Sequence, residues 1–258
     1  MITYMSKTGV YHEKQGIENQ DFICGANNSR YSTICLADGV SACKYAKTGA
    51  ETACKVSADI LINHAERIFS ADSREAVYII LKKVRNELEK LSKNSDIQEY
   101  SSTLACVLCD RANNKIFYLN LGDSLIMAGK KDVCRIISQP CDSRNGLADV
   151  TTAENAEILA DSGIMDADGL ESVILCSDGA YNLMYNRTRI NSEIKSAITE
   201  KNFNSLKSIL SEKENFDDCS FIALDLNKSQ EDKNHELYKN TRNGKKKLYG
   251  QGGYNLSA

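Results

Sequence analysis

The sequence has 258 residues, of which 42% are hydrophobic and 26% charged, enough for one large or two small globular domains with a core. The net charge of -3 gives no basic footprint for nucleic acid, and no window approaches the ~18 consecutive apolar residues of a membrane-spanning helix. The N-terminus also lacks the apolar stretch and cleavage site of a signal peptide. We therefore expect a cytoplasmic protein that binds neither nucleic acid nor membrane.

The predicted elements alternate between strands and helices with no obvious linker. Apolar and β-branched runs predict strands over 33–37, 103–109, 115–120, 125–128, 133–137, 173–176 and 220–225. Hydrophobic residues at helical spacing predict two long helices between the first two strands, with faces marked by Val56, Ile60, Leu61 and Ile68 and by Val77, Leu81, Val84, Leu88 and Leu91. A third long helix is predicted over 190–210, and a short one near 153–160. The order indicates one α+β domain over residues 1–226.

Residues 227–258 differ in composition from the rest of the chain. They carry seven Lys or Arg against three Asp or Glu and almost no aliphatic residues, so we expect a basic, loosely ordered tail.

The ten cysteines are scattered singly through the predicted strands and helices, which favours buried, reduced thiols over a disulfide framework. Cys106 and Cys109 have zinc-like spacing. Residues three apart on a strand point to opposite faces, however, so these two thiols are not expected to share a metal.

Acidic residues gather at the predicted strand ends. Asp-Gly follows an apolar strand twice, at 38–39 and at 178–179, and further acids stand at Asp21, Asp123 and 217–218. Asp-Gly is also a strong hairpin signal, and any one of these acids alone is best explained as a turn or helix cap. As a set, carboxylate and carbonyl oxygens select hard cations, and the three histidines are too few for a zinc site. The set therefore suggests a centre for Mg²⁺ or Mn²⁺.

Six short motifs follow one another along the chain: ENQDF (18–22), LADGV (36–40), STLACVL (102–108), LNLGDS (119–124), LCSDGAYNLM (175–184) and DDCSFIAL (217–224). In kind and order they resemble the type 2C metal-dependent protein phosphatases, the PPM family. The likeness spans roughly residues 8–226 and is closer to the bacterial branch, through Gly9 and His12 before the first motif and Lys44, Gly49 and Ala50 after the second.

The resemblance implies a four-layer α-β-β-α sandwich, in which two packed antiparallel sheets are flanked by antiparallel helix pairs. It also implies two Mn²⁺ or Mg²⁺ ions at the strand ends. Asp38 would bridge both ions, Gly39 would offer its carbonyl oxygen, and Asp21 would join on one side. Asp178 and Asp217 would complete the other ion. Asp217 takes this role over Asp218 because Ser220 keeps the family's D-[ND]-x-[ST] register.

The sequence departs from the family pattern in several places. Gly16 stands where the family has a phosphate-binding arginine, and Val40 where many members have a histidine. His12 could serve as phosphate contact or proton donor, or simply be a loop histidine. Asp123 matches one acid of a third metal site, but Asn182 replaces the other. Lys44 could attract phosphate, although a solvated lysine at the start of a helix is the better explanation.

The resemblance implies hydrolysis of phosphoserine or phosphothreonine on proteins by a metal-bridging water, without a covalent intermediate. A catalytically silent relative that binds a phosphoprotein or partner is the main alternative, favoured by the missing arginine and histidine. An unrelated Mg²⁺-dependent hydrolase of small phosphorylated molecules is a third. The default is a monomer, with a phosphorylated protein as substrate and a cognate serine/threonine kinase as possible partner.

Overall fold

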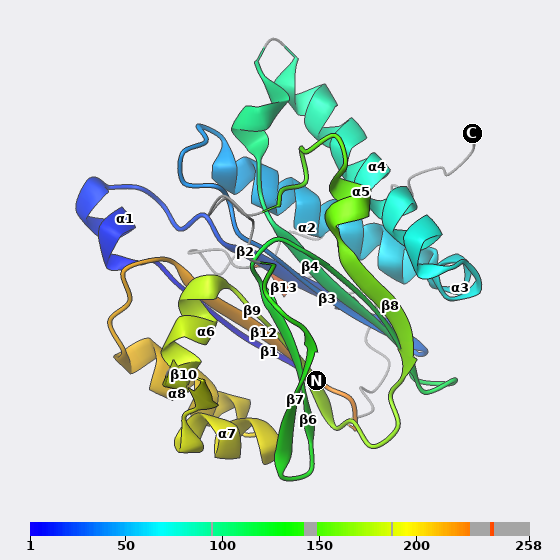
Figure 1. The fold of residues 1–258 in the computed structure, drawn as a ribbon, viewed down its shortest axis with the longest axis vertical. Helices are drawn as coiled ribbons and strands as arrows, with labels where there is room; N and C mark the ends of the chain where they lie inside the picture. Colours follow the sequence, from blue (N-terminus) through cyan, green and yellow to red (C-terminus); the bar gives the residue numbers. More distant parts are fainter. Residues whose placement is uncertain (94, 142–148, 187, 228–237, 240–258) are drawn as a thin grey trace.

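The computed structural model describes residues 1–93, 95–141, 149–186, 188–227 and 238–239. Two antiparallel sheets form the centre of the molecule (Figure 1). The five-stranded sheet has the order β1 (Ile2–Lys7), β12 (Cys219–Asp225), β9 (Ser172–Cys176), β6 (Leu125–Lys130) and β7 (Val133–Ser138). The six-stranded sheet has the order β13 (Tyr238–Lys239), β2 (Phe22–Asn27), β3 (Tyr31–Ala37), β4 (Leu104–Asp110), β5 (Lys115–Leu121) and β8 (Asp161–Asp166).

Helices cover the outer face of each sheet (Figure 1). On the six-stranded sheet lie α2 (Ala46–Asn63), α3 (Ala65–Ser70) and α4 (Ser73–Ser92), followed by the 3₁₀ turn η1 (Ile97–Tyr100) and the short α5 (Ala156–Leu159). On the five-stranded sheet lie α6 (Asp178–Met184), α7 (Ser192–Thr199) and α8 (Phe203–Glu212). The remaining described elements are α1 (Val10–Gln15) and the small hairpin of β10 (Tyr185–Asn186) and β11 (Arg189–Ile190). The predicted four-layer sandwich is confirmed.

Side chains alternate along each central strand between two different cores. In β3, Ile34 and Leu36 pack against the other sheet, while Cys35 and Ala37 pack against the helices. A strand buried on both faces reads as a continuous apolar run, which is why these strands were predicted so easily. The same alternation places Cys106 under the helices and Cys109 between the sheets, as expected, and all ten cysteines are free thiols.

The predicted long helix over 190–210 is wrong: the structure breaks it into α7 and α8. Lys201, at the break, has a positive φ of 56°, and the Asn202 side chain accepts a hydrogen bond from the amide of Ser205 to cap the new helix. The strands β1, β2 and β8, at or beside the sheet edges, were not predicted, and neither were the two-residue strands β10, β11 and β13.

The predicted tail lies almost wholly outside the described residues. Besides Asn227, its described residues are Tyr238 and Lys239, which form β13, whose backbone pairs with Cys24 and Gly25 of β2. Within the described part of the chain, no helix is both long and apolar enough to cross a membrane.

Candidate active site

The predicted acids converge because the strands that carry them end at one edge. Asp21 precedes β2 and Asp38 follows β3, and Phe22 pairs with Ala37, so both acids lie at the same end of the six-stranded sheet. At the facing end of the other sheet, Asp178 opens α6 just after β9, and Asp217 stands just before β12. Asp123 lies in the turn between β5 and β6, which joins the two sheets.

The carboxylates are close enough that their charges raise the pKa values of Asp38 and Asp178. Burial raises the pKa of Asp38 well above its usual range, and the charges of Asp21, Asp178, Asp123 and Asp217 raise it further. Burial likewise raises the pKa of Asp178 to about 6, helped by Asp123 and Asp217. All five candidate acids therefore belong to one electrostatic cluster. Such a concentration of negative charge calls for a cation.

The backbone of Asp38 and Gly39 is fixed by the residues that lead into β4. The amide of Asp38 donates to Thr103 Oγ1 (2.9 Å), and the Thr103 amide returns a bond to the Asp38 carbonyl (2.8 Å). The amide of Val40 donates to the carbonyl of Ser101 (3.0 Å). These bonds hold the Asp-Gly turn in one position before any ligand binds.

Asp21 is held by a buried serine. Its side chain is 3% exposed, and Oδ2 accepts a hydrogen bond from Ser177 Oγ at 3.0 Å, while Oδ1 has no hydrogen-bond partner among the described residues. Burial raises the pKa of Asp21, as does the charge of Asp218, and the hydrogen bonds from Ser220 and Ser177 oppose the rise. A buried carboxylate oxygen without a donor fits a cation ligand.

Asp217 and Asp218 have different surroundings, and the difference supports the choice of Asp217 as ligand. Asp218 is 2% exposed, and its two oxygens accept from the amide of Gly9 (2.8 Å), the amide of Gln20 (2.6 Å) and Nδ1 of His12 (2.9 Å). Asp217 is only half-buried and accepts from the neighbouring amide of Asp218. The oxygens of Asp218 are therefore engaged within the protein, whereas those of Asp217 are more accessible.

His12 is not a surface loop residue. It lies in α1, is 2% exposed, and uses Nδ1 to hold Asp218. Nε2 is buried and has no hydrogen-bond partner among the described residues, so only this atom could contact a phosphate. Sequence reasoning did not find the His12–Asp218 pair, Ser177 or Thr103, because their roles depend on which backbone groups approach them.

The described residues contain no three Asp, Glu, His or Cys side chains already arranged as a metal site. This does not conflict with the electrostatic cluster, because carboxylates without a cation between them repel one another. The donor set, the mutual charge and the unpartnered oxygen of Asp21 together fit hard divalent cations.

The remaining predicted residues lie in three separate segments. Lys44 is exposed, with its ammonium 5.1 Å from the centre of the Tyr45 ring, while the nearby Lys47 pairs with Glu18. Asn182 lies in α6. Gly16 adopts a left-handed conformation with φ 68° at the end of α1. The residue that stands where the family has a phosphate-binding arginine therefore terminates a helix here.

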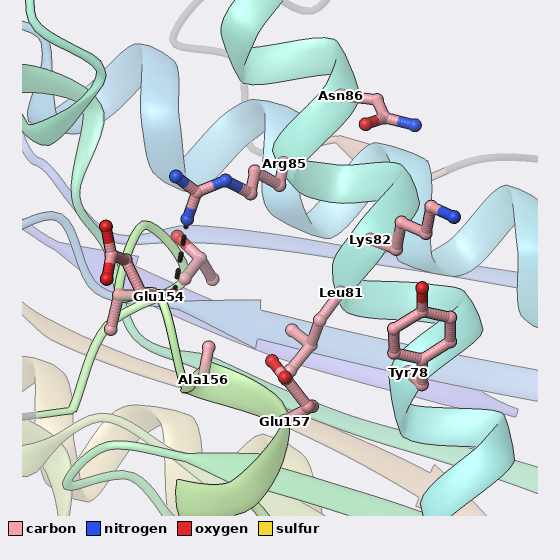
Figure 2. Close-up of a pocket in the computed structure, with 10 residues that line it drawn as sticks. Tyr78, Leu81, Lys82, Arg85, Asn86, Glu154, Ala156 and Glu157 are labelled. Carbon is pink, nitrogen blue, oxygen red and sulfur yellow. Dashed lines mark hydrogen bonds between the residues drawn. The ribbon is translucent and has the colours of Figure 1, made fainter.

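A groove of about 310 Å³ lies elsewhere, between α4 and residues 151–157 (Figure 2). Tyr78, Lys82, Arg85 and Glu157 line it, and Arg85 reaches across to donate from Nη1 to the carbonyl of Thr152 at 3.0 Å. None of the candidate acids lines this groove. Converging carboxylates are better evidence of chemistry than a hollow lined by two bases and two acids, so we place the candidate site at the strand ends.

Residues 8–211 match the family model for protein phosphatase 2C. This span is well over half of the chain. The chain belongs to the protein phosphatase 2C family. The resemblance seen in the sequence is therefore confirmed, and membership supports a phosphatase that acts on phosphoproteins. No curated protein sequence matches the chain.

Solved structures share the fold of this protein phosphatase 2C chain. A bacterial serine phosphatase has a TM-score of 0.66 at 15% identity, over 89% of this chain and 98% of that one. Stp1 from Staphylococcus aureus, a serine/threonine phosphatase, has 0.63 at 15%, over 87% and 94%. RsbX in complex with magnesium has 0.56 at 12%, over 86% and 92%. At such identities these likenesses establish the fold.

Proposed function

We propose that this protein hydrolyses phosphoserine or phosphothreonine on proteins with the help of two Mg²⁺ or Mn²⁺ ions. The observation that carries the proposal is the convergence of Asp21, Asp38, Asp178 and Asp217 from four separate segments at one edge of the two sheets. The magnesium in the RsbX complex belongs to that protein, but it supports the choice of a hard cation for a related fold.

The ligand roles follow the order of the motifs. Asp38 would bridge the ions, with the Gly39 carbonyl and Asp21 on one side and Asp178 and Asp217 on the other. When bound, such ions supply a water of lowered pKa and neutralise charge on the phosphoryl oxygens. Thr103 and Ser177 contribute by holding Asp38 and Asp21 in fixed positions.

Further residues take additional roles in this proposal. His12 could reach a phosphate oxygen or donate a proton through Nε2. Asp123 could hold a third ion, weakly, since Asn182 stands where a second acid is expected. Lys44 could attract phosphate. A cognate kinase as partner and a monomeric state remain proposals from family resemblance.

The test is hydrolysis of p-nitrophenyl phosphate and of a phosphothreonine peptide with Mn²⁺, with Mg²⁺ and with EDTA. We expect turnover that needs the metal and falls by ~100-fold or more in Asp38→Asn, because asparagine lacks the anionic oxygens that are proposed to hold both ions. Asp132→Asn, an exposed acid in the turn between β6 and β7, is the matched control and should behave as wild type.

One observation favours a second function. Gly16 and Val40 replace the family's arginine and histidine, as they would in a silent module that binds phosphoproteins. Folded protein that binds Mn²⁺ and phosphopeptides but turns over neither substrate would establish that alternative and refute the first.

A further inference from the structure

Two aromatic side chains stand exposed beside the candidate metal ligands. Tyr11 of α1 is 44% exposed and Phe216 is 71% exposed. Their ring centres are 5.3 Å apart and the rings are tilted by 30°, within the range of favourable aromatic pairs. Single exposed apolar residues are common on protein surfaces, but two in contact at a reaction centre form a surface that a partner can cover.

Backbone hydrogen bonds hold the segments that carry the two rings in place. The amides of Val10 and Tyr11 donate to the carbonyls of Asn215 (2.9 Å) and Phe216 (3.0 Å). The start of α1 is also packed tightly against the chain beside Phe216, since a Cβ on Gly9 would lie 2.3 Å from the carbonyl carbon of Asp217. A surface that is already ordered loses little conformational entropy when a ligand binds.

The pair also lies next to a candidate ligand along the chain. Phe216 is the residue before Asp217, so their Cα atoms are about 3.8 Å apart. An extended peptide advances about 3.3 Å per residue. With a phosphorylated side chain at the carboxylates, the residues next to it would lie within reach of the two rings.

We propose that Tyr11 and Phe216, the aromatic pair, form a docking surface for the substrate polypeptide. The pair selects an aromatic or large aliphatic side chain within about three residues of the phosphorylated one. This inference rests on the proposed function and adds a sequence preference to it. The rings offer apolar faces, so the occupant that gains most is an apolar side chain that leaves water.

The test uses phosphothreonine peptides of alanine and serine in which one phenylalanine is moved from four residues before the phosphothreonine to four after it. The readout is the ratio of kcat/KM with phenylalanine to kcat/KM with alanine at each position. Both values come from the same enzyme variant, so any effect of the substitution on the chemical step cancels. Wild type should show a ratio of about ten at one or two positions, the size expected from one aromatic contact with its buried area.

Tyr11→Ser and Phe216→Ser should each bring that ratio close to one, with melting temperatures near wild type because both side chains are exposed. Ile158→Ser is the matched control: this residue of α5 is 79% exposed and belongs to the opposite helical layer, so the ratio should be kept. A flat profile in wild type, or a preference that survives in both variants, would overturn the proposal.

Two further outcomes distinguish a failure of the proposed function from a failure of the docking surface. If wild type hydrolyses neither p-nitrophenyl phosphate nor any peptide, the proposed function fails. The docking surface is then judged by fluorescence anisotropy of the same labelled peptides, where the same tenfold preference and its loss are expected. If instead wild type is a dimer that Phe216→Ser dissociates in sedimentation analysis, the pair is a self-association interface and the proposal is wrong.

Discussion

At the scale of single residues, the most informative side chain is one that is not expected to touch a metal. Asp218 joins three segments, through the amides of Gly9 and Gln20 and the ring of His12. Two of those segments lead directly to candidate ligands, because Gln20 precedes Asp21 and Asp218 follows Asp217. The position of both ligands therefore depends on one buried carboxylate.

We expect His12→Ala to weaken Mn²⁺ binding by about 10- to 100-fold, because His12 holds Asp218, which fixes the backbone next to Asp21 and Asp217, and groups that position metal ligands commonly have effects of that size. Titration calorimetry of the variant and wild type measures this without reference to catalysis. His64→Ala, at the end of α2, is the control. If both variants bind Mn²⁺ like wild type, His12 does not position the ligands, and only the direct phosphate role of Nε2 remains for it.

Ser177 gives a second prediction at this scale. Ser177→Ala removes the hydrogen bond to Asp21 Oδ2 and leaves a buried carboxylate with fewer donors. We expect Mn²⁺ affinity to fall by about tenfold. Ser196→Ala, in α7, is a suitable comparison, since its hydroxyl does not contact the carboxylates. Equal affinities for the two variants would contradict the role given to Ser177.

The candidate ligands could be predicted from the sequence, but the residues that hold them could not. Asp-Gly at a strand end is visible as a pattern, and the order of motifs separates ligands from ordinary turn residues. Asp218 and Ser177 lie in the same motifs, but the pattern does not show what their side chains contact. Their function arises from backbone amides and side chains that come from distant segments, as when Gly9 and Gln20 approach Asp218 across some 200 positions.

At the scale of elements, an ion pair at the far end of the six-stranded sheet holds β3 and β4 together. Asp110, whose side chain is 1% exposed, accepts from Arg30 Nε (3.2 Å) and Nη2 (2.9 Å) and from the amide of Ala112 (3.0 Å). Burial alone would raise the pKa of Asp110, but these hydrogen bonds, with others from Asn113, outweigh it, and the net pKa is lowered.

Asp110→Asn should lower the free energy of unfolding by about 1.5–3 kcal/mol at pH 7, the usual worth of hydrogen bonds to a charged group. A lowered pKa stabilises the fold above the unfolded-state value of about 4, and this contribution is lost as the pH falls through the folded-state pKa. Urea unfolding at pH 7 and near pH 3 should thus show a smaller difference at the acid pH, whereas a constant difference would contradict the ionic origin. Asp132→Asn again serves as control.

The helical elements show where sequence patterns are insufficient. The hydrophobic spacing of 190–210 is continuous, yet the chain turns at Lys201 and Asn202. The edge strands β1 and β8 escaped prediction because most of their residues are only half-buried, and β2 escaped because Gly25 interrupts its apolar run and Asn27 ends it. Central strands, buried on both faces, were placed within two residues.

At the scale of the whole molecule, the four layers enclose three hydrophobic cores. One core lies between the sheets and one lies under each helical layer. All candidate acids lie at one edge of the two sheets, so none of them has to be accommodated inside the apolar cores.

The first strand, β1, pairs with β12, which lies near the end of the described chain. This pairing has a consequence for protein synthesis. Ile2 of β1 pairs with Leu224 of β12, and β12 separates β1 from β9. A nascent chain leaving the ribosome cannot close the five-stranded sheet until β12 emerges, and pairings this distant in sequence form slowly. A product stopped before Asp217 lacks both a candidate ligand and the strand that β1 needs. Premature termination should thus yield an inactive chain with exposed strand edges, a target for chaperones and proteases rather than an unregulated phosphatase.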